Sequence, residues 1–110
     1  MPEEFSLPIR GVVFINDTDA PARNISLSIL MLREEAKCSH VPARGKRMVD
    51  YPLREYGGNY LVVSWFHRGR LWRSEPDVAL TPGGIDPRQP VELVVTLGER
   101  GTMKLAITQP

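Results

Sequence analysis

Apolar and polar residues alternate with a period of two along most of the chain, the pattern of strands that bury one face. The segments that this pattern predicts as strands are 9–14, 25–32, 48–53, 60–66, 71–74, 91–97 and 103–107. Residues 33–37 fit a helical turn, and Pro52 indicates an edge or a bulge for its strand. Turn residues such as those of Asn16–Pro21 separate the strands. The sequence therefore predicts an all-β fold, an antiparallel β-sandwich of about seven short strands, immunoglobulin-like or transthyretin-like.

Two hairpins can be assigned a register. In the first, the loop at His67–Arg70 pairs Phe66 with Leu71 and Trp65 with Trp72, whether the loop has two or four residues. In the second, the apolar faces of 91–97 and 103–107 coincide only if Val95 opposes Leu105. That register leaves the three-residue loop Glu99–Gly101, whose last residue must be left-handed, as glycine allows.

Length and composition limit the class of protein. The chain has 110 residues, which we expect to form a single domain over 1–110. Its 9 Gly and 10 Pro favour strands and turns, and we predict a Pro/Gly-rich loop region at 75–90 and a flexible segment at 1–6. A net charge of +1 argues against a general nucleic-acid binder. No apolar run is long enough to predict a membrane span.

The charge is unevenly distributed. Residues 33–73 hold nine basic and four acidic residues, a balance of +5, whereas the remainder holds five basic and nine acidic residues, a balance of −4. The densest basic cluster is Arg44, Lys46 and Arg47. Such a patch fits either anionic lipid headgroups or an acidic partner segment, and the alternative is an ordinary solvated loop.

Residues with reactive or metal-binding side chains are few. Cys38 and His40 would supply two ligands of the about four that a structural metal site needs, and no acid or oxyanion site accompanies them as a nucleophilic pair. Asp17 and Asp19 lack the glycine and glutamate of a calcium loop, so we interpret them as turn formers. His67 is interpreted as a solvated turn residue. We therefore predict no catalytic, cofactor or metal site and no enzymatic activity.

Two tripeptides match the N-glycosylation motif. They begin at Asn16 and Asn24. The motif matters only in a eukaryotic secretory chain.

The central hairpin has two apolar faces, of which a sandwich buries one. Leu61, Val63, Trp65 and Trp72 form the more continuous face, which we predict to be core. The other face carries Tyr60, Val62, Phe66 and Leu71, with Arg73 at its rim. We predict this face as a partner-binding patch, since aromatic residues and arginine are enriched in interfaces. The alternative is that residues 75–90 cover it.

The strand segments Ile9–Phe14, Ile25–Ile29, Asn59–Trp65 and Val91–Leu97 together resemble the YscW/ExsB-type pilotins, small lipoproteins of bacterial type III secretion systems. The resemblance rests on length, strand order and pattern over most of the chain. The excess of arginine over lysine, eleven against three, agrees with a bacterial source of high GC content.

The resemblance implies a role in protein transport rather than a reaction. A pilotin is held by a lipid at the periplasmic side of the outer membrane and binds the secretin subunit, which it helps to reach the membrane and assemble. The sequence shows neither a signal peptide nor a lipid-acceptor cysteine, because Cys38 lies too far inside, so the anchor is expected on a segment removed from this domain. The alternative is a transthyretin-like or carbohydrate-binding module of another envelope protein.

Overall fold

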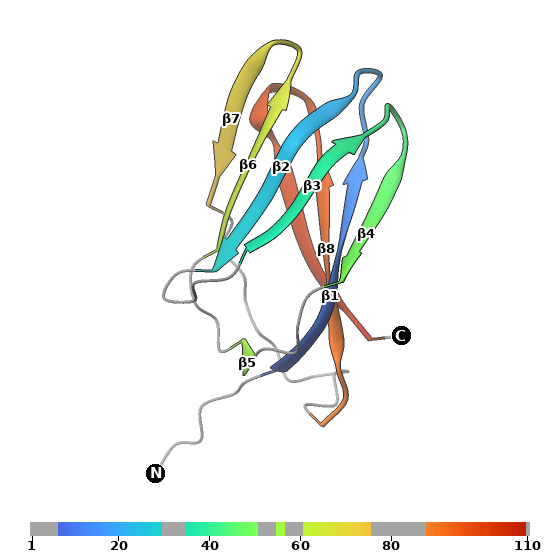
Figure 1. The fold of residues 1–110 in the computed structure, drawn as a ribbon, viewed down its shortest axis with the longest axis vertical. Coiled ribbons are helices and arrows are strands. Elements are labelled where there is room, and N and C mark those ends of the chain that lie inside the picture. Colours follow the sequence, from blue (N-terminus) through green and yellow to red (C-terminus); the bar gives the residue numbers. More distant parts are fainter. Residues whose placement is uncertain (1–6, 30–34, 51–54, 57–60, 76–87, 110) are drawn as a thin grey trace.

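Two β-sheets pack face to face in the computed structural model, which describes residues 7–29, 35–50, 55–56, 61–75 and 88–109 (Figure 1). The strands are β1 (Leu7–Asn16), β2 (Ala22–Ile29), β3 (Glu35–Val41), β4 (Lys46–Asp50), β5 (Glu55–Tyr56), β6 (Leu61–His67), β7 (Arg70–Ser74), β8 (Val91–Leu97) and β9 (Met103–Thr108), and a 3-10 turn, η1 (Glu99–Gly101), precedes β9. One sheet has the order β4-β1-β8-β9, with β5 paired to β1, and the other has the order β3-β2-β6-β7. The predicted all-β sandwich is confirmed.

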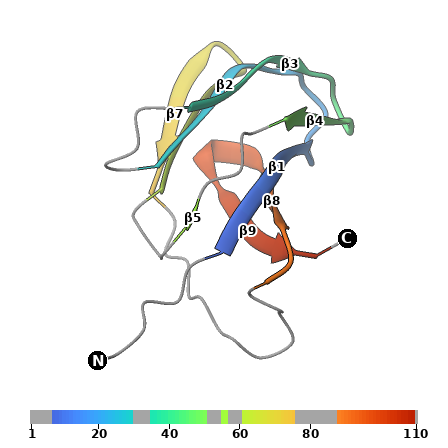
Figure 2. The same cartoon turned by 60° about the horizontal axis from the view of Figure 1, so that its bottom comes forward.

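The sheets are antiparallel with one exception among the described strands. β1 and β8 run parallel, so that Val13 lies beside Val94 although the two are far apart in sequence. Figure 2 shows β1, β8 and β9 in one layer and β2, β3 and β7 in the other. Within the described ranges, no helix has the length and apolar character needed to cross a membrane.

The core lies between the sheets and comes from alternate positions of nearly every strand. Its buried hydrophobic residues are Ile9, Val12, Phe14, Ala22, Ile25, Leu27, Ala36, Val41, Leu61, Val63, Trp65, Val91, Leu93, Val95 and Leu97. Trp72, Met103, Leu105 and Ile107 pack partly buried against this set. The prediction that the tryptophan side of the central hairpin is core is therefore confirmed.

Both predicted hairpin registers are confirmed. Trp65 pairs with Trp72 and Phe66 with Leu71, and in the second hairpin Val95 pairs with Leu105. Gly101 is left-handed as expected, with φ of +76°. A side chain at position 101 would overlap the ring of Trp72, so the glycine also permits β7 to pack against η1.

The predicted helical turn at 33–37 is wrong for its described part. Glu35 to Lys37 begin β3, which pairs with β2 and places Ala36 and Val41 in the core. Burial of these two side chains outweighs the weak local preference of a polar segment. The strand predicted at 48–53 begins earlier, at Lys46. Tyr60 and the segments 1–6 and 76–87 lie outside the described residues, as does most of the predicted 75–90 loop.

Candidate binding surface

The outward face of the sheet β3-β2-β6-β7 carries most of the residues predicted to bind a partner. Phe66 and Leu71 lie side by side on β6 and β7 and are 40% and 61% exposed. Val62 is half-buried and Arg73 is exposed on the same face. We call this surface the Phe66 face.

The strand register places Arg23 in this surface, which the sequence did not reveal. Arg23 on β2 pairs with Phe66 on one side and with His40 of β3 on the other. The pairing of β2 with β6 shifts between Arg23 and Ser26, and Asn24 within this bulge has φ of +49°. The extra residue directs Arg23 outward while both Ala22 and Ile25 face the core.

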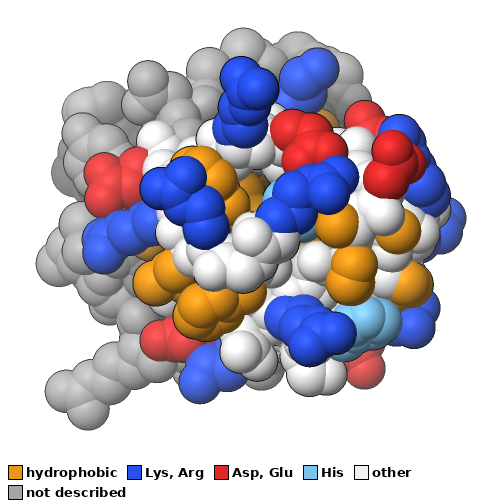
Figure 3. All heavy atoms as spheres, turned by 90° about the horizontal axis from the view of Figure 1, so that it is seen from above, with side chains coloured by type: hydrophobic (Ala, Val, Ile, Leu, Met, Phe, Trp, Pro, Cys, Tyr) orange, Lys and Arg blue, Asp and Glu red, His pale blue; other side chains and the backbone are white. Residues whose placement is uncertain are grey.

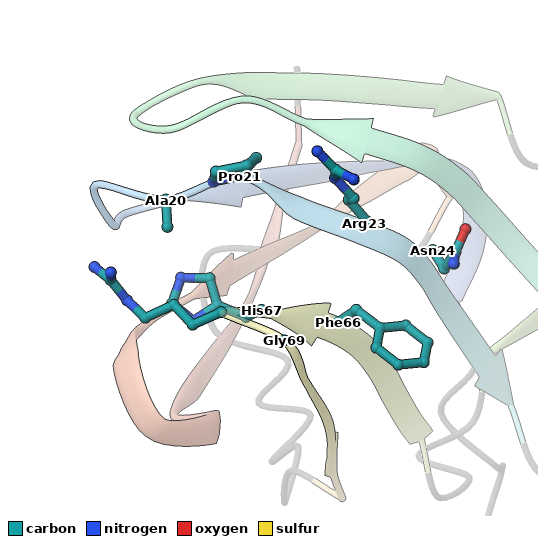
Figure 4. Close-up of a pocket in the computed structure, with 8 residues that line it drawn as sticks. Ala20, Pro21, Arg23, Asn24, Phe66, His67 and Gly69 are labelled. Atoms are coloured by element: carbon teal, nitrogen blue, oxygen red, sulfur yellow. The ribbon is translucent and has the colours of Figure 1, made fainter.

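A hollow of about 420 Å³ opens beside Phe66 at this bulge. The residues that line it are Ala20, Pro21, Arg23, Asn24, Phe66, His67, Arg68 and Gly69. Figure 4 shows Arg23 and Asn24 projecting from β2 and Phe66 from the end of β6. The hollow combines an aromatic wall with two guanidinium groups, which suits an apolar side chain followed by a carboxylate.

The two guanidinium groups differ in their partners. Arg68 donates two hydrogen bonds to Glu99, of 3.0 and 2.9 Å. Arg23 has no ion pair within the part of the chain that the structure describes. Elsewhere on the face, Lys37 lies 3.7 Å from Glu35 and Arg73 lies 3.4 Å from Glu75. Arg23 is therefore the cation beside Phe66 that is left for a partner's carboxylate.

The Arg68–Glu99 pair makes a prediction about pH. The hydrogen bonds from Arg68 lower the pKa of the Glu99 carboxyl below its ordinary value. A carboxyl whose pKa is lower in the folded state stabilises the fold above its unfolded pKa, and this contribution is lost as pH falls through the folded pKa. We expect Glu99→Gln to show a smaller drop in the urea midpoint between neutral and acidic pH than the wild type. An equal drop in both proteins would contradict the role of Glu99.

His67 is not a solvated turn residue, contrary to the sequence-based interpretation. It is 3% exposed, and its Nε2 lies 2.9 Å from the Thr18 hydroxyl. The Asn16 amide nitrogen donates to three backbone carbonyls, of Ala20, Val41 and Pro42, so its Oδ1 faces the Thr18 hydroxyl at 2.7 Å. The Thr18 hydroxyl therefore links the Asn16 side chain to the His67 ring.

The line Thr18–His67–Glu99 has the order of a hydrolase triad but not its accessibility. The Nδ1 atom of His67 lies 3.8 Å from a Glu99 oxygen. Thr18, however, is 1% exposed and already bonded to Asn16 and Ala20, so a substrate has no approach to its hydroxyl. This line of residues instead fastens the β1–β2 turn to the end of β6.

The predicted basic patch lies at the loop end of the sandwich. Arg44 is paired with Asp17 at 2.9 Å and with Asp19 at 3.1 Å, so these acids close a turn and neutralise part of the patch. Lys46 and Arg47 are exposed. Figure 3 looks onto this end and shows lysine and arginine side chains spread across it, with hydrophobic side chains between them.

The remaining sequence candidates are placed as follows. The Cys38 thiol is half-buried and lies 3.5 Å from the His40 carbonyl oxygen rather than against its ring. Among the described residues, no three His, Cys, Asp or Glu side chains gather as metal ligands would. Asn16 is buried and bonded, so of the two glycosylation tripeptides only the one at Asn24 presents an exposed asparagine.

The two tryptophans do not form an exposed platform of the kind that sugar-binding modules use. Trp65 is completely buried. Trp72 is half-buried, and the Arg70 guanidinium covers its ring at 5.0 Å.

Comparisons with known proteins identify a fold and nothing further. No protein-family model and no curated protein matches the chain. Among solved structures, the NMR structure of a protein from Eubacterium rectale is similar, with a TM-score of 0.54 over 100% of this chain and 95% of that chain. The two sequences are 12% identical, so this likeness concerns the architecture of the sandwich alone.

Proposed function

We propose that this protein is a non-enzymatic binding module whose Phe66 face takes up a segment of a partner protein that carries apolar and acidic side chains. The observation that carries the proposal is the exposed Phe66–Leu71 pair beside Arg23. Exposed aromatic and arginine side chains together are typical of residues that dominate binding energy.

The resemblance to pilotins gives the partner we propose, a tail segment of the secretin subunit. In this proposal the module assists the targeting and assembly of the secretin and is held at the periplasmic face of the outer membrane by a lipid. A reading frame that extends upstream into a signal peptide with a lipid-acceptor cysteine is the expected result of sequencing the gene. A native start at Met1 would contradict the anchor.

The binding surface is tested by two variants of matched exposure. Leu71 is 61% exposed on the Phe66 face, and Met48 is 56% exposed on the other sheet. We expect Leu71→Asp to weaken binding of the secretin tail segment by roughly tenfold or more. Met48→Asp should leave the affinity unchanged. Isothermal titration calorimetry gives both values.

Circular dichroism and thermal melting serve as the control for folding. Because Leu71 lies on the solvent side of its strand, the melting midpoint of Leu71→Asp should stay close to that of the wild type. Equal affinities of the two variants for the tail would contradict the proposed surface, as would no binding by the wild type.

A further inference from the structure

The outward face of the other sheet also carries a row of apolar residues. We use the word level for a row of paired residues that runs across β4, β1, β8 and β9. The middle level of this face consists of Met48, Val13, Val94 and Ala106. Met48 is 56% exposed, Ala106 is exposed, and the two valines are half-buried. We call this surface the Val13 face.

Charges flank this apolar level with opposite signs on its two sides. The neighbouring level on one side consists of Lys46, Ile15, Thr96 and Lys104. The neighbouring level on the other side consists of Asp50, Gly11, Glu92 and Thr108. Arg10, next to Gly11, forms no ion pair with either carboxylate. The face therefore has a basic side, an apolar middle and an acidic side, on which Asp50 is exposed and Glu92 is half-buried.

We propose that the Val13 face binds the same face of a second copy of this chain, in a twofold-symmetric dimer. A twofold axis lying in the interface and running across the strands turns the basic side of one copy onto the acidic side of the other. Lys46 then lies over Asp50 of the second copy, and each apolar residue of the middle level meets its own counterpart.

Shape agrees with charge in this arrangement. The same axis sets Ile15 of one copy over Gly11 of the other, so the one apolar side chain of that flanking level meets a position without a side chain. An axis along the strands would instead place Lys46 over Lys104, which like charges oppose. Charge and size thus select one of the two symmetric ways of stacking the sheets.

The size of the face sets the strength that we expect. Four strands about 4.8 Å apart and five residues rising about 3.3 Å each give a footprint of roughly 300 Å². A stable interface usually buries about 800 Å² on each partner. The dimer should therefore be weak and form progressively between about 10 µM and 1 mM.

A charge exchange tests the proposal with exposed positions only. The variant K46E/K104E makes both flanks acidic, and the variant D50K/T108K makes both flanks basic overall. Each variant alone should remain monomeric in sedimentation velocity, because flanking levels of the same charge would face each other in its dimer. An equimolar mixture should form a heterodimer that is tighter than the wild-type dimer.

The wild type and two further variants complete the test. The wild type should approach twice its monomer mass of 12.4 kDa as concentration rises, and Met48→Asp should abolish this rise. Leu71→Asp should leave it unchanged, so loss of dimer and loss of partner binding are separate outcomes. A wild type that stays monomeric throughout would overturn the proposal and leave the face to another segment or partner. A mixture that does not associate would overturn it as well.

Discussion

Replacing Trp65 with alanine should lower the free energy of unfolding by about 3–5 kcal/mol, the usual cost of removing a large aromatic side chain from a core. Trp65 is completely buried, and it lies opposite Trp72 on the inner side of the central hairpin. Its removal leaves a cavity between the sheets that the surrounding strands cannot fully close. Urea unfolding followed by circular dichroism measures the loss.

The matched control lies on the outer side of the same hairpin, where Leu71 is paired with Phe66. Leu71→Ala removes an exposed side chain and should change stability by less than about 0.5 kcal/mol. Similar losses at Trp65 and Leu71 would contradict the assignment of the inner and outer faces. That assignment is what leaves Phe66 and Leu71 available to a partner.

Replacing Asn16 with alanine is the second large effect that we expect, about 2–3 kcal/mol of lost stability. The Asn16 amide nitrogen donates hydrogen bonds to the carbonyls of Ala20, Val41 and Pro42, and its oxygen accepts a hydrogen bond from the Thr18 hydroxyl. Alanine satisfies none of these buried groups. The loss should appear in the urea midpoint and in faster amide exchange of the β1–β2 turn.

A threonine at an exposed strand position provides the comparison. Thr108→Ala on β9 should change stability by less than about 0.5 kcal/mol, because its side chain faces solvent. If Asn16→Ala lowers the free energy of unfolding no more than Thr108→Ala does, the hydrogen-bond network at this turn does not hold the sandwich together. The position of His67, and with it the wall of the hollow beside Phe66, would then need another cause.

The hairpins were predictable because local signals agree. The alternation of Trp65 with its neighbours, and the glycine at position 101, fix both register and turn within a few residues. The division of each hairpin into an inner and an outer face followed from the same alternation. Alternation therefore predicts Phe66 and Leu71 on the outer face, where burial under residues 75–90 was the alternative, and both are exposed.

The features that were missed depend on partners far away in sequence. His67 lies on the inward side of β6, and the partner that bonds its buried ring, Thr18, is 49 residues earlier. Arg23 reaches the Phe66 face because of a bulge against β6. β3 is a strand because β2 pairs with it.

The Val13 face was missed for a different reason. Both sides of β1 are apolar, as Val12 and Val13 illustrate, so alternation does not reveal which side faces outward. The charged levels that flank the face appear only once β4, β1, β8 and β9 are placed in order. The parallel pairing of β1 with β8 is a tertiary feature that no local turn signal announces.

Mapping the bound secretin tail segment by amide chemical shifts is the most direct test of the proposed binding surface. In a titration of the isotope-labelled protein, the largest shift changes should fall on β6, β7 and the Arg23–Asn24 bulge, with small changes on β4 and β9. Changes that centre instead on the Val13 face, or no changes at all, would contradict the account.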